Sequence, residues 1–190
     1  PAQALDAVSA LVQELTARQA ALWRSELEPA LAAQAIRVGR VDDCDPQELA
    51  ELTERFDREI FPVLTPLGVG PGQPFPYISG LSLSLGVLVD DPLTGERRFA
   101  RVKVPEGLAR FQAVGGRGLL VPLDRVIAYF LPRLFPGMEI AESAVFRVTR
   151  DADFDVSDEA DDLLQAVTAE LRRRRFGDVV RLEVDAAASE

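Results

Sequence analysis

Basic side chains in segments with a strand-like apolar pattern are the residues best suited to chemistry in this sequence. They are Arg101, Lys103, Arg147 and Arg181, and Arg150 follows Arg147 on the same segment. Guanidinium and ammonium groups donate charge-assisted hydrogen bonds to phosphate oxygens. If the strands are neighbours, Arg101, Lys103, Arg147 and Arg181 form a basic stripe that could guide a polyanion, and Arg150 is a further candidate for such binding. An ordinary exposed sheet face with cross-strand ion pairs fits the same pattern.

Two residue counts exclude several classes of reactive site. The 190 residues contain no histidine and a single cysteine, Cys44. Histidine is the usual base of Ser-His and Cys-His nucleophilic sites and a common metal ligand, so those sites are excluded. One cysteine cannot form an intramolecular disulfide or a cysteine-based zinc site. We therefore expect neither catalytic residues nor a metal site in this chain.

Two shorter patterns suggest ion binding less directly. Asp151, Asp153 and Asp155 have the spacing that opens a calcium loop, but Val156 stands where such a loop needs glycine. A solvated turn before a helix is the default interpretation of these aspartates. The run at residues 172–175 is four arginines, which could bind phosphate or simply complement the dipole at a helix C-terminus.

Charge and hydropathy narrow the possible partners. Acidic residues outnumber basic ones by 31 to 21, which gives a net charge of −10 and argues against nucleic-acid binding through overall charge. No apolar run reaches the length of about 18 residues that a membrane-spanning helix needs. The first residues also lack the pattern of a signal peptide. We expect a cytoplasmic protein with no membrane insertion.

Residues 1–60 have the pattern of helices. Leu5, Val8, Val12, Leu15 and Leu22 recur at helical spacing and form one apolar stripe. The Asp-Pro pair at residues 45–46 is a typical helix start, with an N-cap residue followed by proline in the first turn. We expect antiparallel helices in this part of the chain.

The composition changes at residue 61. Residues 61–76 hold five prolines and three glycines, which argues against a helix, and also apolar residues unusual in a solvated linker. We expect extended chain packed on a core, although a domain connector has the same composition.

The remaining residues mix strand and helix patterns. Alternating apolar positions predict strands at residues 81–89, 99–104, 119–121, 140–150 and 179–184, and helices follow Pro122 and Ser157. The elements do not alternate strictly, and the first two strands form a hairpin. We therefore predict an α+β fold, in which N-terminal antiparallel helices precede a mainly antiparallel or mixed sheet packed with helices. The expected domains are 1–60 and 61–190.

Several long motifs resemble the middle region of bacterial polyphosphate kinases, in the same order and spacing. They are FPVLTPL at 61–67, PFPYISGLSLSL at 74–85, RFARVKVP at 98–105, LFPGME at 134–139, FRVTRDAD at 146–153, ELRRRRFG at 170–177 and VRLEV at 180–184. One departure is Gly80, where the family usually has asparagine. The resemblance implies the rear part of the N-terminal helical domain, residues 1–60, followed by most of the head, or middle, domain.

The resemblance also implies a role. Polyphosphate kinases reversibly transfer the γ-phosphate of ATP to polyphosphate, with Mg²⁺, through a transiently phosphorylated histidine in C-terminal domains. No position here matches those catalytic residues. The implied role is that of a non-catalytic fragment without a cofactor of its own, which serves homodimerisation and forms part of the polyphosphate tunnel. Its implied partners are a second copy, polyphosphate and the catalytic domains of the same polypeptide. The alternative is a free-standing, non-enzymatic dimerisation module that reuses the head fold.

Overall fold

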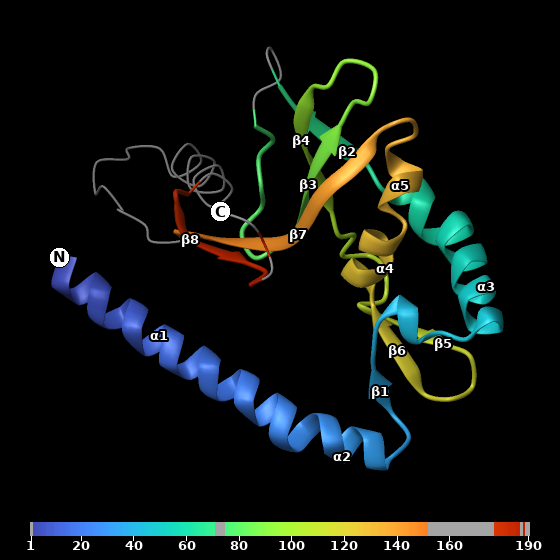
Figure 1. Cartoon of the computed structure of the whole chain (residues 1–190). Coiled ribbons are helices and arrows are strands. Elements are labelled where there is room, and N and C mark those ends of the chain that lie inside the picture. Colours follow the sequence, from blue (N-terminus) through green and yellow to red (C-terminus); the bar gives the residue numbers. More distant parts are fainter. Residues whose placement is uncertain (1, 71–74, 152–176, 187, 189–190) are drawn as a thin grey trace, which may run out of the picture. The chain divides into compact units, whose positions relative to one another are not determined.

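The structure is a computed structural model that describes residues 2–70, 75–151, 177–186 and 188 (Figure 1). The chain divides into two compact units. One combines Pro1–Thr53 with Phe111–Pro122, and the other combines Glu54–Arg110 with Leu123–Glu190. The expected helix after Ser157, the arginines at 172–175, and the aspartates at 153 and 155 lie outside the described residues.

The first unit begins with a long helical segment. Helix α1 (Ala2–Leu22) continues through one π-helical turn, Trp23–Leu27, into α2 (Glu28–Ala33). The amide of Glu28 bonds the carbonyl of Trp23, five residues back. Pro29 therefore does not break the helix, because it lies in the first turn of α2, where a missing amide donor is tolerated.

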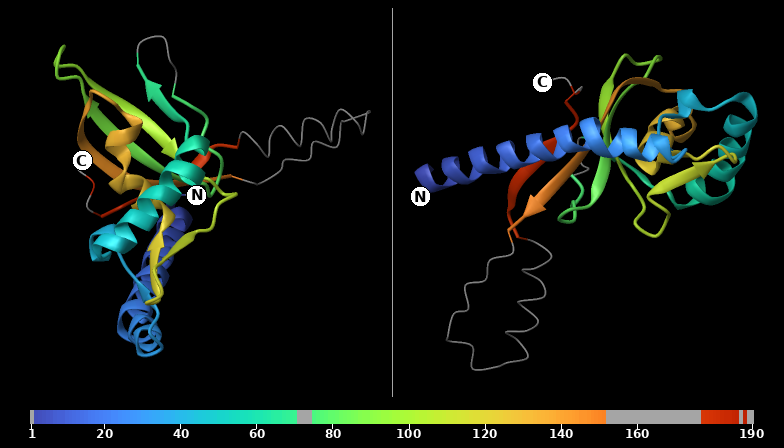
Figure 2. Two further views of the ribbon diagram at one scale, coloured as in Figure 1. Left: turned by 90° about the vertical axis from the view of Figure 1, so that its right-hand side faces the viewer. Right: turned by 90° about the horizontal axis from the view of Figure 1, so that it is seen from below.

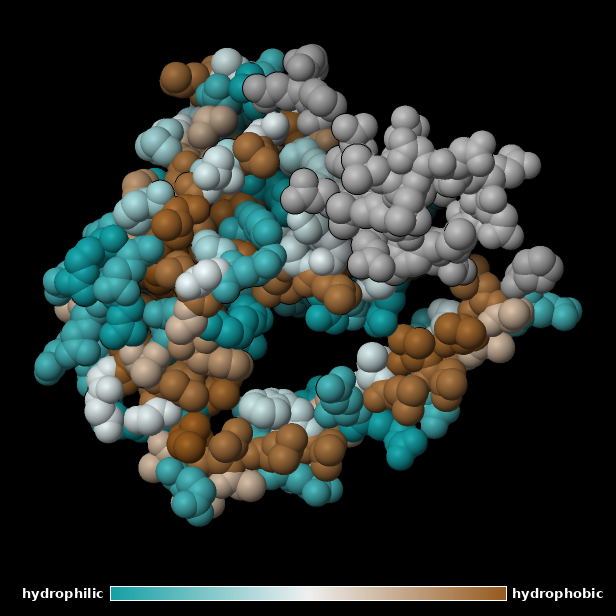
Figure 3. Space-filling view, turned by 180° about the vertical axis from the view of Figure 1, so that it is seen from behind, coloured by the Kyte–Doolittle hydropathy of each residue, from teal (hydrophilic) through white to brown (hydrophobic). Residues whose placement is uncertain are grey.

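The expected apolar stripe of α1 is present but uncovered. Leu5, Val8 and Leu15 are each more than half exposed, and Leu22 is nearly so. Apolar side chains gather along this helix in the space-filling view of Figure 3. Such a stripe normally packs against another element, so this helix presents an apolar surface.

A small three-stranded sheet completes the first unit, in the order β1 (Arg37–Val38), β6 (Leu119–Pro122), β5 (Phe111–Val114). Strand β1 runs parallel to β6, whereas β5 and β6 form a hairpin. The hairpin loop needs glycine at residue 118, where φ is +73° and a Cβ would lie 1.8 Å from the carbonyl oxygen of Ala35. The sequence patterns predicted β6 but neither β1 nor β5, because such short strands show little periodicity.

The buried carboxylate of Glu48 links the start of helix α3 (Pro46–Arg55) to the hairpin loop. The Asp45 side chain caps the helix by accepting the amides of Gln47 and Glu48, each at 2.9 Å. Arg117 donates to both carboxylate oxygens of Glu48, at 3.1 and 2.8 Å. These hydrogen bonds lower the pKa of Glu48, which stays charged although it is buried. The helix start predicted at residues 45–46 is confirmed.

The second unit contains a five-stranded sheet in which all neighbouring strands are antiparallel. Its order is β2 (Pro66–Val69), β4 (Arg97–Lys103), β3 (Leu83–Asp90), β7 (Glu139–Arg150), β8 (Val179–Val184). The predicted α+β fold, with N-terminal helices before a largely antiparallel sheet, is confirmed. The 61–76 segment is extended at β2 as expected, but Phe61–Val63 forms one 3₁₀ turn, because proline is tolerated in the first turn of a helix.

The two faces of this sheet differ in what covers them. We call the face that carries Leu85, Val87, Ala100 and Val102 the inner face; all four side chains are fully buried. Helix α4 (Leu123–Tyr129) contacts β3 and places Val126 and Ile127 in the core, and α5 (Leu131–Leu134) follows it (Figure 1). The ring of Phe130, between these helices, stacks on Phe56 at 4.4 Å.

The opposite side is the outer face, and the strand register defines its residues. Because Phe146 pairs with Ser84 and Val184, and Val148 pairs with Leu182, these side chains point away from the inner face. Phe99 and Leu88 form another pair on the same side. The sequence correctly grouped Ala144, Phe146 and Val148 on one face of their strand. Only the register shows that this face is opposite to Leu85 and Val87.

Candidate functional site

The four basic residues predicted to form one stripe lie on different sides of the sheet. Arg101 pairs with Gly86 and Lys103 pairs with Ser84, which places both on the outer face. Arg147 pairs with Leu83 and with Glu183, which places it on the side of the inner face. Arg181 pairs with Thr149 and therefore lies on the same side. The continuous stripe that the sequence suggested is therefore not formed, because alternating strand positions face opposite ways.

Arg101 is a buried anchor. Its side chain donates from Nε to Ser84 Oγ at 3.1 Å and from Nη1 to the carbonyl oxygen of Tyr77 at 3.0 Å. Burial lowers the pKa of this guanidinium, and only 5% of the residue is exposed. It holds the Tyr77 segment against the outer face, and its position is poorly suited to meeting a polyanion from solvent.

Arg150 contacts the same segment, also on the outer face of the sheet. It donates from Nε to the carbonyl oxygen of Ile78 at 2.7 Å and from Nη1 to that of Gly177 at 2.6 Å. Its guanidinium lies 4.4 Å from the centre of the Tyr77 ring, which is a cation–π arrangement. Arg101 and Arg150 together fix residues 77–78 through main-chain carbonyls.

Arg147 and Arg181 meet at one carboxylate. Arg147 forms a bidentate pair with Glu183 at 2.8 and 3.0 Å, and Arg181 reaches the same carboxylate at 3.0 Å. The hydrogen bonds from Arg147 lower the pKa of Glu183 and the same pair raises the pKa of Arg147. Both guanidinium groups remain substantially exposed, so the pair can exchange partners with solvent anions.

A cavity of about 450 Å³ lies where β3 and β4 meet the start of the next loop. We call it the basic cavity. Arg147 and Arg110 line it together with Glu106, and Lys103 pairs with Glu106 at 2.8 Å. Arg110 forms a short ion pair with Asp124 and was not among the predicted residues, because it precedes a strand without a clear pattern. The other residues that line the cavity are Gly80, Leu81, Ser82, Leu83, Val104, Pro105 and Leu108.

The basic cavity thus combines two cations, Arg110 and Arg147, with residues of the Gly80 turn. Arg147 is paired with the partly exposed carboxylate of Glu183, and such pairs contribute little to stability. Arg110 is paired with the buried carboxylate of Asp124. A phosphate chain offers the same kind of oxygen acceptor as these carboxylates, with more negative charge, so a polyanion in this cavity would compete with them for the two cations.

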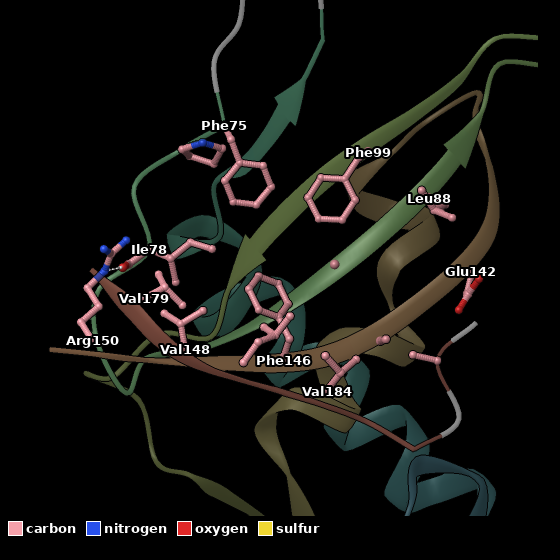
Figure 4. A pocket seen from close by; sticks show the side chains of 15 residues that line it. Phe75, Ile78, Leu88, Phe99, Glu142, Phe146, Val148, Arg150, Val179 and Val184 are labelled. Carbon is pink, nitrogen blue, oxygen red and sulfur yellow. Dashed lines mark hydrogen bonds between the residues drawn. The ribbon is translucent and has the colours of Figure 1, made fainter. Parts of the chain in front are cut away.

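The outer face carries a second, apolar cavity of about 650 Å³, shown in Figure 4. We call it the outer-face groove. The rings of Phe75 and Phe99 stack at 5.7 Å across it, and Ile78, Phe146 and Val148 form a buried cluster at one end. Glu142 and Arg150 stand at opposite ends in Figure 4. The groove contains no arrangement of reactive groups, and sequence patterns missed it because it combines side chains from five segments.

The described part of the chain holds neither a metal site nor a membrane-spanning helix. No three metal-ligating side chains among its His, Cys, Asp and Glu residues come together as a metal site. Its helices are all too short or too polar to cross a membrane. Of the three aspartates that resemble a calcium loop, only Asp151 is described, and its amide bonds the carbonyl of Asp178.

Comparison with known proteins gives consistent matches. Residues 47–190 match the family model described as "Polyphosphate kinase middle domain". The chain is 51% identical over 187 residues to a polyphosphate kinase of Streptomyces coelicolor and 46% identical over 195 residues to one of Mycobacterium ulcerans. Each alignment covers 97% of this chain but only 25% and 26% of the relative, so the chain spans about a quarter of their length.

A solved structure shares the fold. The crystal structure of polyphosphate kinase from Porphyromonas gingivalis superposes with a TM-score of 0.73 at 24% identity, over 90% of this chain and 29% of that one. The match to the family model extends over most of the sequence and includes both cavities of the second unit. The chain therefore belongs to the polyphosphate kinase family, within the part that forms its middle domain.

Proposed function

We propose that this chain is a non-catalytic part of a polyphosphate kinase that transfers the γ-phosphate of ATP reversibly to polyphosphate. The match of residues 47–190 to the middle domain carries this proposal. The absence of histidine from the whole sequence supports it, since phosphoryl transfer through a phosphohistidine is then impossible within this chain. In this proposal ATP and Mg²⁺ bind other domains of the parent enzyme, and the protein is cytoplasmic.

Within the parent enzyme, we propose that this region assists assembly and guides the polyphosphate chain. The basic cavity supports the second role, because Arg147 and Arg110 both line it, and Lys103 is paired with its lining residue Glu106. Arg181 adds to the same side through its shared contact with Glu183. Arg101 and Arg150 contribute indirectly in this proposal, since they position the segment that leads into the Gly80 turn.

The non-catalytic role is tested by incubating the isolated chain with ATP labelled at the γ-phosphate and with Mg²⁺. We expect no acid-labile label on the protein and no polyphosphate product. The full-length Streptomyces coelicolor polyphosphate kinase, assayed in parallel, is the positive control. Labelled protein or labelled polymer from the isolated chain would contradict the proposal.

The guiding role is tested by titrating the chain with polyphosphate at low and high salt. We expect salt-sensitive binding that weakens roughly threefold to tenfold in Arg147→Ala, because a phosphate contact is lost. Arg98→Ala is the matched control, since Arg98 is also exposed and paired but lies in the β3–β4 hairpin near Glu96. Equal affinity for both variants, or binding without salt dependence, would remove the basic cavity from the proposal.

A second candidate function is a free-standing dimerisation module without a link to catalysis. The exposed apolar stripe of α1 favours an interaction role of this kind. The sequence of the encoding gene distinguishes the two candidates. A reading frame that continues after Glu190 into catalytic domains supports the kinase, and a stop codon there supports the module.

A further inference from the structure

The outer-face groove exists because small side chains lie at its floor and larger ones surround them. Gly86 on β3 and Ala144 on β7 are direct partners in the sheet, and both line the groove. A Cβ on Gly86 would lie only 3.0 Å from the ring of Phe99, so the glycine leaves room for that ring. Leu88 and Phe146, each two positions further along its strand, line the same groove. The sequences of two neighbouring strands therefore build this cavity.

Two further segments wall the groove. Strand β8, at the border of the sheet in Figures 1 and 2, contributes Leu182 and Val184, which are 61% and 48% exposed. The segment before β3 contributes Phe75, whose ring lies beside that of Phe99 in Figure 4. The volume of about 650 Å³ lies within the range of roughly 300–1,000 Å³ that is typical of small-ligand sites. An apolar ligand of that size would cover side chains that otherwise face solvent.

The groove has a cation at one end. Arg150 donates to the carbonyl oxygens of Ile78 and Gly177. It also lies over the ring of Tyr77, and all three partners are uncharged. Among the residues that the structure describes, no carboxylate pairs with Arg150, and its Nη2 donates to no acceptor. The residue is half-buried, and a charge in such a position is stabilised by an opposite charge. Glu142 stands at the opposite end of the groove in Figure 4, where it repels an anion.

We propose that the outer-face groove binds a small amphipathic anion, whose carboxylate pairs with Arg150 and whose apolar chain lies over Gly86 and Ala144. The guanidinium fork suits the two oxygens of a carboxylate. Arg150 and Glu142 are eight positions apart on β7, which corresponds to roughly 26 Å at about 3.3 Å per residue. The groove is thus long enough for an extended chain, and the charges at its two ends set the direction of that chain.

This ligand differs from the polyanion proposed for the basic cavity. A phosphate chain is charged along its whole length, and burying those charges against apolar side chains costs free energy. An amphipathic anion brings one charge to the cation of Arg150 and apolar surface to the rest of the groove. Its binding is a function beyond the one proposed above, and neither function depends on the other.

Calorimetric titration of the chain with octanoate, decanoate and dodecanoate tests the apolar part of the ligand. All three are used below the concentrations at which they form micelles. We expect affinity to rise roughly tenfold for each pair of added methylene groups, because each pair buries further apolar surface in the groove. Absence of dodecanoate binding, or an affinity that does not depend on chain length, would overturn the proposal.

Variants on the two faces of β7 test the location. Ala144→Leu fills the floor of the groove, and we expect the affinity for dodecanoate to fall on the order of tenfold or more. Ser143→Leu is the matched control, because Ser143 is exposed and pairs with Val87 on the side of the inner face. Leu182→Ala removes part of the wall without overpacking the sheet, and should weaken binding about threefold to tenfold. Wild-type affinity in both Ala144→Leu and Leu182→Ala would place the ligand elsewhere, for example on the apolar stripe of α1, and contradict the groove site.

Removal of the charge tests the head group. Arg150→Met should lower the affinity for decanoate on the order of tenfold, because a charge-assisted pair is lost. The affinity for decanol, which has the same chain without the charge, should change by less than about twofold, since its apolar burial is unchanged. Equal losses for both ligands would mean that Arg150 only supports the structure, and an unchanged decanoate affinity would mean that it does not pair with the ligand. Either result overturns the assignment of the head group to Arg150.

Discussion

The inner and outer faces of the five-stranded sheet are built from equally apolar strands but are covered in different ways. The inner face is fully buried, and helix α4 contacts its strand β3. Its buried side chains include Leu85, Val87, Ala100 and Val102. On the outer face, Phe99 and Leu88 are only half buried and line an open groove. An alternating apolar pattern therefore identifies a sheet face that can be buried. Whether that face is buried depends on the element that packs over it.

Arginine is used differently on the two sides as well. On the outer face, Arg101 and Arg150 bind main-chain carbonyls of the covering segment and so hold it in place. On the other side, Arg147 and Arg181 pair with the partly exposed carboxylate of Glu183, and both guanidinium groups remain open to solvent. Arginines on strands with similar sequence patterns therefore differ in role. Their hydrogen-bond partners and burial decide whether they hold the structure together or face a ligand.

The largest expected effect comes from truncating leucine on opposite faces of one strand. Leu85→Ala on the inner face should lower the free energy of unfolding by about 2–5 kcal/mol, because the buried side chain leaves a cavity. Leu88→Ala, on the outer face of the same strand, should cost about 1 kcal/mol or less. Urea denaturation of both variants measures the difference. Equal losses would show that the outer face is as well covered as the inner one.

The next effect separates the two kinds of arginine. Arg101→Met should lower the free energy of unfolding by about 1–3 kcal/mol, since it removes the donor that bonds the buried Ser84 hydroxyl and the partly buried Tyr77 carbonyl. Arg181→Met should change it by no more than about 0.5 kcal/mol, because exposed ion pairs contribute little. Thermal unfolding of the matched variants tests this order. A larger loss in Arg181→Met would reverse the assignment of roles.

Ligand binding gives a smaller effect. Glu183→Gln removes the carboxylate shared by Arg147 and Arg181, so both cations become available to an anion. Affinity for polyphosphate at low salt should rise roughly threefold, with a steeper salt dependence. Glu96→Gln, which frees only Arg98 in the hairpin, is the matched control. Unchanged affinity in Glu183→Gln would argue that these arginines do not meet the polymer.

The smallest effect is the pH dependence of the same carboxylate. Its pKa is lowered in the folded chain by the hydrogen bonds from Arg147. Its contribution to stability, about 0.5 kcal/mol, is therefore present above the unfolded pKa of about 4.3 and is lost as pH falls through the folded pKa. Wild type and Glu183→Gln should differ at pH 7 and converge only once the pH is below the lowered, folded-state pKa, in denaturation experiments on dilute protein. A difference independent of pH would contradict this cause.

Much of the fold was predictable because its elements are locally specified. The strand at 179–184, the hairpin of 81–104 and the helix start at Asp45 follow from period-two alternation, turn residues and capping. The candidate site was less predictable. Arg147 was identified by its position on a strand, but Arg110 was missed, and Arg101 proved to be buried. Their partners come from residues 14 to 36 positions away, which local patterns do not encode.

By itself the sequence determined the α+β class, most strands, the family resemblance and the absence of histidine chemistry, because each depends on residue type and near neighbours. Only the tertiary structure decided that Phe146 and Leu85 point to opposite sides, and that the predicted basic stripe is divided. The physical reason is strand register. Side chains alternate with a period of two, so the pairing between distant segments sets which residues share a face.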